Sequence, residues 1–215
     1  MIRDITLTFD NGPTEAVTPQ VLDVLERHGI KATFFVLGRN LQTPQTTALI
    51  ERAARAGHWI GNHTFTHSVP LGLTQGPEVA RREITDTQAL IEHVAGPRRL
   101  FRPFGGGGKL GAHLLSASAL SLLQDGGYTC VLWNSIPHDW DDPQGWVETA
   151  LDQCRAQPWS LVVLHDYDTG AMANLERFIL CAQAQGARFR QDFPTECVPL
   201  EQGRATQSLA PFTSS

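Results

Sequence analysis

The chain has 215 residues, of which 41% are hydrophobic and 18% are charged, and its formal net charge is −5. This length and composition indicate one globular domain with a sizeable core. The acidic balance and the lack of a basic block argue against a nucleic-acid or anionic-membrane partner, and no apolar run is long enough to span a bilayer.

Short apolar segments alternate with helical patterns along the chain. Strands are predicted at 5–9, 32–37, 58–61, 100–101, 129–133 and 161–164, with a last one within 188–198. Helices are predicted at 18–29, with Thr18 as N-cap, and at 43–57, 77–96, 112–124, 143–154 and 171–185. Because buried strands alternate with helices, we predict an α/β fold: a distorted (β/α)7-type barrel of parallel strands, with its chemistry at their carboxyl ends. We expect one catalytic domain over residues 1–201 and a flexible tail over 202–215.

The first candidate site combines residues from two strand ends. Asp10 ends the first predicted strand and Asn11 begins a tight turn, a pattern that by itself is typical of turn capping. His63 and His67 follow the third strand, and a helical turn there would place both imidazoles on one face, where they can bind one metal ion. A carboxylate, an amide oxygen and two imidazoles are what a hydrolase needs to hold a metal-bound water beside a base. We therefore interpret the two histidines as ligands rather than as surface residues.

Further polar residues follow later strands. Arg102 either holds a carboxylate through its fork of donors or forms a structural salt bridge. Asp139 can orient an imidazole, and Trp140 either walls a pocket or simply packs. His165 is a candidate general acid, because the pKa of histidine is the one nearest neutrality, whereas Asp166 beside it is interpreted as a loop cap.

Three other features define what the site is not. The four glycines at 105–108 lack the spacing and the Ser or Thr of a phosphate loop, which predicts a flexible rim loop instead. The four cysteines are widely spaced without a CxxC pair, so we interpret them as free, mostly buried thiols rather than as a disulfide framework or a zinc knuckle. The N-terminus lacks the pattern of a signal peptide, so we expect a cytoplasmic protein, or a secreted one if a leader has been removed.

In this order, the segments from Thr8 to Asp166 resemble the NodB-homology domain of polysaccharide deacetylases, carbohydrate esterase family 4. The matching motifs are an aspartate-containing first motif, H-[ST]-x-x-H, an Arg-Pro-aromatic third motif, an Asp-Trp fourth and an L-x-H-like fifth with Val163 in place of Leu. The resemblance implies the NodB-homology fold and hydrolysis of N-acetyl groups on an amino-sugar glycan of chitin-oligomer or peptidoglycan type. It also implies a divalent metal, Zn²⁺ or an ion such as Co²⁺. The sequence does not define an oligomeric state.

The resemblance also implies a role for each matching residue. Asp10 matches the catalytic base and His165 the general acid, while Arg102 matches the residue that orients the base and Asp139 the acid that tunes the histidine. The implied metal ligands are Asn11, His63 and His67, and the expected pocket residues are Phe104, Trp140 and Leu164. A backbone N–H near Phe104 is expected to help to hold the oxyanion.

Three departures from the family pattern leave alternatives open. Asn11 stands where the family usually has Asp, which removes one negative charge from the metal site. The third motif is one residue short at Arg102-Pro103-Phe104, and Asp139 directly precedes Trp140. The muramic-lactam deacetylases of spore formers also carry Asn-Gly in the first motif, which implies that Asn is compatible with activity. One alternative is a metal-free or weak-metal hydrolase of a small cyclic amide or ureide. The other is a non-catalytic member, a glycan-binding or structural relic, against which the retained residues argue.

Overall fold

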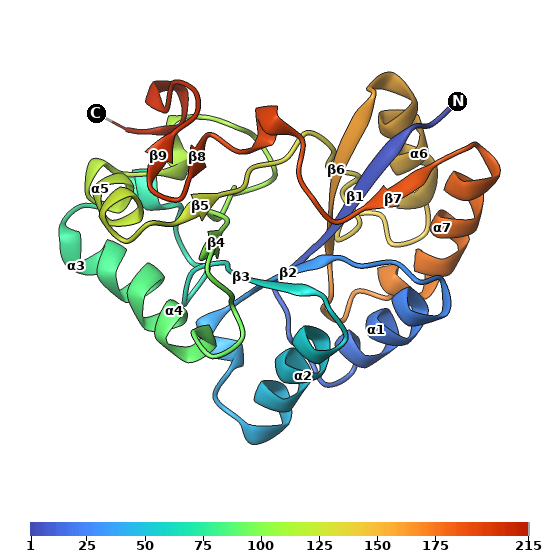
Figure 1. The fold of residues 1–215 in the computed structure, drawn as a ribbon, viewed down its shortest axis with the longest axis horizontal. Coiled ribbons are helices and arrows are strands. Elements are labelled where there is room, and N and C mark those ends of the chain that lie inside the picture. The colour runs from blue at the N-terminus through green and yellow to red at the C-terminus, as the bar shows by residue number, and fades with distance from the viewer. Residues whose placement is uncertain (215) are drawn as a thin grey trace.

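The computed structural model describes residues 1–214, which form one curved sheet with helices packed around it (Figure 1). The strands are β1 (Asp4–Asp10), β2 (Thr33–Val36), β3 (Trp59–Asn62), β4 (Leu100–Phe101), β5 (Thr129–Cys130), β6 (Trp159–His165), β7 (Arg188–Arg190), β8 (Leu200–Glu201) and β9 (Arg204–Ala205). The helices are α1 (Thr18–Arg27), α2 (Pro44–Arg55), α3 (Pro77–Ala80), α4 (Asp86–Ile91), α5 (Ala117–Asp125), α6 (Trp146–Ala156) and α7 (Leu175–Ala184).

The sheet is mostly parallel and curls into a half-barrel. Its order is β6-β1-β2-β3-β4-β5-β8-β9, and β7 pairs with the first half of β1. Only the β5–β8 and β8–β9 pairs within residues 1–214 are antiparallel. Between β5 and β6, the N–H of Ser135 donates to the carbonyl of Leu161 at 3.2 Å and its own carbonyl accepts from Val163 at 3.1 Å. This bridge joins the segment after β5 to β6, which lies at the other end of the strand order. The predicted α/β fold, a distorted barrel of parallel strands, is confirmed.

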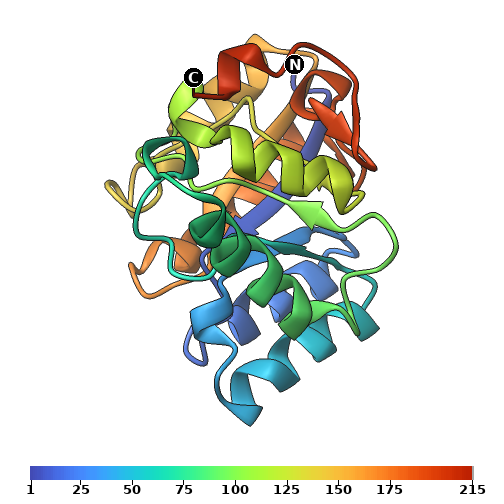
Figure 2. The same cartoon turned by 90° about the vertical axis from the view of Figure 1, so that its left-hand side faces the viewer.

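Strand alternation sends neighbouring side chains into two different cores. In β6, Val162 and Leu164 join the apolar cluster that includes residues of α1, α2, α6 and α7. Leu161 and Val163 join the second cluster, which includes residues of α3 and α5. Those two helices lie on the side of the molecule that faces the viewer in Figure 2. Because both faces of the strand are covered, its uninterrupted apolar sequence is the expected one.

Several helix boundaries differ from those predicted. The helix expected over 77–96 ends at Ile91 and contains a π-helical turn, Arg81–Thr85, between α3 and α4. The helix expected at 112 begins at Ala117, because the Ser116 hydroxyl caps it by accepting from the N–H of Ala119. Thr18 is inside α1 rather than at its N-cap, which is Val17.

The remaining predictions concern the C-terminal segment, the cysteines and the absence of an apolar run long enough to span a bilayer. The segment from 202 onward contains β9 and a 3-10 helix (Ala210–Phe212), and the N–H of Leu115 donates to the Phe212 carbonyl at 3.0 Å, so the boundary expected at residue 201 is not a break in the packing. The cysteines are free thiols, and three of the four are buried, as predicted. None of the helices in residues 1–214 has the length and apolar character needed to cross a membrane.

Candidate active site

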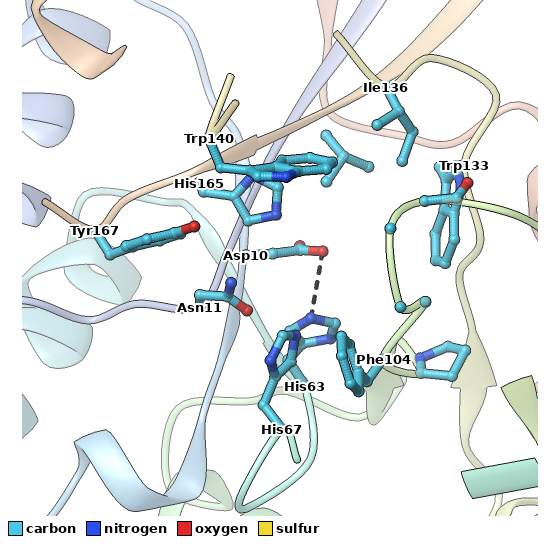
Figure 3. A pocket seen from close by; sticks show the side chains of 16 residues that line it. Asp10, Asn11, His63, His67, Phe104, Trp133, Ile136, Trp140, His165 and Tyr167 are labelled. Atoms are coloured by element: carbon cyan, nitrogen blue, oxygen red, sulfur yellow. Dashed lines mark hydrogen bonds and ion pairs between the residues drawn. The ribbon is translucent and has the colours of Figure 1, made fainter. Parts of the chain in front are cut away.

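The carboxyl ends of several parallel strands meet around one cavity of about 170 Å³ (Figure 3). Asp10 ends β1 and is in register with His165 at the end of β6, so these two side chains start from neighbouring positions. His63 directly follows β3 and Arg102 directly follows β4. The strand ends therefore bring together residues that lie more than 150 positions apart in the sequence, as Asp10 and His165 do.

Asp10 is held by a fully buried arginine. Nη1 of Arg102 donates to Oδ1 of Asp10 at 2.9 Å and to the hydroxyl of Thr8 at 2.7 Å. Its Nε and Nη2 donate to the carbonyls of Val131 and Leu132, each at 3.1 Å. These contacts fix the guanidinium, so one carboxylate oxygen of Asp10 is fixed with it. The other oxygen, Oδ2, lies 3.5 Å from Nε2 of His63.

His165 is paired with a second buried carboxylate. Nδ1 of His165 donates to Oδ1 of Asp139 at 2.8 Å, and the backbone N–H of His165 donates to Oδ2 at 2.9 Å. Burial by itself lowers the pKa of His165, but the hydrogen bond and charge of Asp139, together with the charges of Asp10 and Asp166, outweigh burial, so the pKa is raised. Trp140 packs edge-on against the imidazole, with ring centroids 4.8 Å apart. The Nδ1 contact leaves Nε2 of His165 as the nitrogen available to a bound molecule.

His63 and His67 lie on the opposite wall with their ring centroids 4.9 Å apart. Nδ1–H of His63 donates to the carbonyl of Arg102 at 2.8 Å, which leaves Nε2 with a free lone pair. Burial lowers the pKa of His63, and it lowers the pKa of His67 to about 2. Both imidazoles are therefore neutral near pH 7, the form that binds metal ions. The Phe104 ring lies against His67, with ring centroids 3.8 Å apart and the ring planes tilted by 38°.

Asn11 supplies an amide oxygen on the same side of the cavity. Its φ of 74° lies in the left-handed region, which Asn tolerates better than most residues. The Asn40 amide donates to the Asn11 carbonyl at 2.7 Å and fixes the turn. The side-chain Oδ1 of Asn11 is buried and has no hydrogen-bond partner among residues 1–214. A buried acceptor without a partner is costly unless a ligand satisfies it.

These three side chains fit a divalent metal ion. Two neutral imidazoles and one amide oxygen form a donor set that suits zinc or cobalt, although an amide oxygen binds more weakly than a carboxylate. In the described part of the chain, no group of three His, Cys, Asp or Glu side chains is arranged to hold a metal. The donor set at this cavity differs from such a group because its third member is an amide, that of Asn11. The ion would be held by Asn11, His63 and His67, the residues expected from the sequence.

Two predictions about local geometry are wrong. Residues 63–67 do not form a helical turn; φ is 71° at Thr64 and 52° at His67, and these bends bring the rings together. Leu164 does not line the cavity, because its side chain packs in the apolar cluster with residues of α1, α2, α6 and α7. Val163 lines the cavity instead. Val163 lies two positions before His165 and therefore shares its face of β6. Phe104 and Trp140 do line the cavity, as expected.

Some residues of the cavity had no separate signal in the sequence. Tyr167 lies edge-on to His165, with centroids 5.8 Å apart, and faces the cavity beside Asn11. Trp133 lines the far side, where its indole N–H donates to the carbonyl of Gly108 at 2.8 Å and fixes the glycine-rich loop. Position shortly after a strand end was the available signal for both aromatic residues.

Asp166, interpreted from the sequence as a loop cap, is a buried carboxyl. It is 1% exposed, and the Thr18 hydroxyl donates to its Oδ2 at 2.5 Å. Its backbone N–H donates to the carbonyl of Asp10 at 3.3 Å, so it supports the strand end that carries the Asp10 carboxylate. Burial raises the pKa of Asp166 to about 6. A Cβ on Gly12 would lie 2.2 Å from Oδ2, so this residue also fills the space beneath the turn at Asn11.

A carboxylate and an imidazole at neighbouring strand ends, each fixed by its own buried partner beside a metal-type donor set, are the features of a hydrolase. The family model for polysaccharide deacetylase matches residues 2–131, and the chain belongs to this family. The resemblance inferred from the five motifs is thereby confirmed.

Named relatives and solved structures agree with this membership. The chitooligosaccharide deacetylase of Rhizobium leguminosarum bv. trifolii is 37% identical over 175 residues, which cover 76% of this chain and 72% of the relative. The peptidoglycan-N-acetylglucosamine deacetylase PgdA of Listeria monocytogenes is 30% identical over 189 residues, and the match spans 87% of this chain but only 37% of the Listeria protein. A family 4 acetyl xylan esterase of Clostridium thermocellum, solved with a cobalt ion, is 28% identical with a TM-score of 0.69, covering 87% of each chain.

Proposed function

We propose that this protein is a metal-dependent deacetylase that hydrolyses N-acetyl groups of an amino-sugar glycan of the chitin-oligomer or peptidoglycan type. One observation carries the proposal: Asp10 and His165, each fixed by a buried partner, flank the cavity that Asn11, His63 and His67 also line. Amide hydrolysis needs a base that takes a proton from water and an acid that gives one to the leaving amine. The two groups fit these two tasks.

Asp10 is the base in this mechanism. Arg102 occupies its Oδ1, so Oδ2 is the oxygen that accepts the proton of the attacking water. The water oxygen then forms a bond to the acetyl carbonyl carbon, and the carbonyl oxygen becomes the oxyanion of a tetrahedral intermediate. A divalent ion bound by Asn11, His63 and His67 would lower the pKa of water and polarise the carbonyl.

His165 is the acid. Asp139 stabilises its protonated form, and Nε2–H is the donor that protonates the nitrogen as the carbon–nitrogen bond breaks. The products are acetate and a free amine on the sugar. Because Asp10 gains a proton and His165 loses one, a later proton transfer between the two groups or through water resets the site.

The walls of the cavity favour a sugar substrate. Trp140 and Tyr167 lie on the side of His165, and Phe104 lies on the side of His67. Aromatic faces around a few convergent polar groups are typical of sites that orient a ring-shaped ligand. Two of the three proteins reported above are named as deacetylases of chitooligosaccharides and of peptidoglycan N-acetylglucosamine, and the third is named as an acetyl xylan esterase. None of the three is named for a cyclic amide or ureide. We therefore do not propose the small-amide alternative.

The test is acetate release from N-acetylglucosamine oligomers by protein that has been stripped with a chelator and then resupplied with Zn²⁺ or Co²⁺. We expect release only after metal is added. Asp10→Asn is expected to lower release by about 10²–10⁴-fold. The variant should remain folded, with a loss of stability of about 1–3 kcal/mol because buried Arg102 keeps an amide oxygen but loses its counter-charge. Full activity in the stripped protein would contradict the metal dependence, and undiminished activity in Asp10→Asn would contradict the role of the base.

A further inference from the structure

The segment that carries His63 and His67 rests against a helix with an irregular turn. Residues 77–91 form α3, a five-residue π turn (Arg81–Thr85) and α4 in succession, and the N–H of Asp86 donates to the carbonyl of Arg81 across five residues. A π turn adds one residue to a helical turn and is frequent at functional sites. In this protein, Glu83 of the π turn contacts the segment between the histidines, and Ile84 contacts Asn62 directly before His63.

Glu83 makes three hydrogen bonds to that segment. Its Oε2 accepts from the backbone N–H groups of Phe65 at 2.9 Å and Thr66 at 2.8 Å, and its Oε1 accepts from the Thr66 hydroxyl at 2.7 Å. The residue is only 8% exposed. A buried carboxylate is costly unless charge-assisted hydrogen bonds satisfy it, and here all three of its bonds go to two adjacent residues. Glu83 is therefore committed to holding this segment.

The next residue of the π turn supports the start of the same segment. The side-chain amide of Asn62 donates to the carbonyl of Ile84 at 2.7 Å, and the Asn62 side-chain oxygen accepts from the N–H of Thr64 at 2.9 Å. Together with the contacts of Glu83, this means that three successive backbone N–H groups, at residues 64, 65 and 66, are bound by side-chain acceptors. The backbone between the two histidines is thus fixed from the helix side.

We propose that Glu83 is a positioning residue that holds residues 65 and 66 so that both His63 and His67 can bind one metal ion. The proposal rests on the metal site of the proposed function. Positive φ values at Thr64 and His67 are disfavoured for these residue types, so the conformation needs support from its surroundings. Without Glu83, two partly buried backbone donors lose their acceptor and the segment relaxes. The imidazoles then lose the arrangement that the ion requires, although neither residue itself has changed.

The test compares Glu83→Ala, Glu83→Gln and a matched control, Glu78→Ala, in the full chain. Glu78 is on the same helical segment, but its side chain is 80% exposed and forms a surface ion pair with Arg81. The dissociation constant of Co²⁺ is measured by competition with a chelator. We expect Glu83→Ala to weaken binding on the order of 10–100-fold. Glu83→Gln is expected to stay within about threefold of the wild type, because its amide oxygen can accept from both N–H groups while its NH₂ faces the Thr66 hydroxyl.

A second readout does not depend on the metal. In metal-free protein, hydrogen exchange at the amides of Phe65 and Thr66 is expected to accelerate by about tenfold or more in Glu83→Ala, but not in Glu83→Gln or Glu78→Ala. If the wild type binds neither Zn²⁺ nor Co²⁺, the proposed function fails, and exchange alone decides the role of Glu83. Unchanged exchange in Glu83→Ala would overturn the proposal, as would equal losses of Co²⁺ affinity in the Ala and Gln variants. If Glu83→Ala does not fold, Thr66→Val replaces it, with Ser68→Ala as its control, because the Thr66 hydroxyl contacts both Glu83 and the Ser68 hydroxyl. Thr66→Val is expected to weaken Co²⁺ binding about threefold and Ser68→Ala to leave it unchanged. Unchanged binding in Thr66→Val, or an equal loss in Ser68→Ala, would overturn the proposal.

Discussion

Replacement of Asp139 by Asn tests the acid side of the site. In the wild type both partners of the Asp139 carboxylate are donors: Nδ1–H of His165 at 2.8 Å and the backbone N–H of His165 at 2.9 Å. An Asn side chain offers one acceptor and one donor group. The backbone N–H of His165 can only donate, so the Asn oxygen must remain its acceptor. The NH₂ group of the Asn then faces Nδ1 of His165. The imidazole then accepts at Nδ1 and is neutral.

The size of the effect follows from the burial of the pair. The Asp139 side chain is fully buried and that of His165 is 12% exposed, so water does not replace the lost charge. The hydrogen bond from the backbone N–H is kept and the one to Nδ1 is reversed, so the charge is the main loss. We therefore expect a loss of stability of about 1–3 kcal/mol, below the figure for breaking a buried pair outright. Without the carboxylate, burial is opposed only by the charges of Asp10 and Asp166, so the pKa of His165 falls below that of the wild type. With the general acid lost at neutral pH, turnover is expected to fall by about 10²–10⁴-fold.

The pH dependence gives this prediction a sign. The folded-state pKa of His165 is raised above 6.5, so the stability that the pair contributes is fully present below pH 6.5 and is lost as the pH rises through the raised pKa. The difference in stability between the wild type and Asp139→Asn should therefore be largest below pH 6.5 and shrink above it. Thermal unfolding at a series of pH values measures this difference, and an NMR titration of the His165 ring measures the pKa itself.

A matched control lies two residues away. Asp141→Asn also removes a carboxylate paired with a histidine, His138 at 3.2 Å, but that pair is exposed. We expect the control to retain wild-type acetate release and an unchanged pKa of His165. A His165 pKa in Asp139→Asn that equals that of the wild type would refute the reasoning, since it would mean that Asp139 does not hold the proton on the imidazole.

Two further predictions concern the turn at Asn11. Asn11→Asp is expected to tighten Co²⁺ or Zn²⁺ binding by about tenfold or more, because a carboxylate replaces a neutral ligand, and to lower the melting temperature of the metal-free protein, because a second carboxylate is buried beside Asp10; equal metal affinity in a chelator competition would contradict the ligand role. Gly12→Ala places a Cβ 2.2 Å from Oδ2 of Asp166 and is expected to destabilise the fold by about 1–3 kcal/mol, and an unchanged melting temperature would contradict this contact.

The strands were predictable because each is a short apolar run whose two faces are both covered, as in Phe34 and Phe35 of β2, which join different cores. The second helix was predictable from its cap: the Thr43 side chain accepts from the N–H of Thr46 as expected. The π turn was not predictable, since the apolar spacing continues through residues 81–85 without a Gly or Pro to mark it. The spacing of apolar residues indicates which face of a helix is buried, whereas a π turn depends on the residues that the helix contacts in the folded protein.

The polar residues of the site could be predicted because the carboxyl ends of parallel strands share one edge of the sheet. The sequence did not predict the conformation of residues 63–67, since positive φ at Thr64 and His67 is stabilised by contacts from distant residues such as Glu83. Leu164 was assigned to the pocket in error, although alternation along β6 from His165 would have selected Val163. The residue types were sufficient to propose the chemistry of the site, whereas the geometry of the site depends on tertiary contacts that the sequence does not show.

In the proposed mechanism, the Asn at position 11 changes the metal-binding part of the site and leaves the proton-transfer part intact. Asp10 is fixed by Arg102 and His165 by Asp139, and neither pair includes a hydrogen bond to the Asn11 side chain, whose oxygen has no partner within residues 1–214. A weaker ligand lowers the affinity for the ion, but occupancy depends on affinity and ion concentration together. Asn11 is therefore compatible with full turnover at a higher concentration of free metal. A relic that had lost its chemistry would have no reason to keep two buried ion pairs directed at one cavity, because an unneeded buried pair adds little stability.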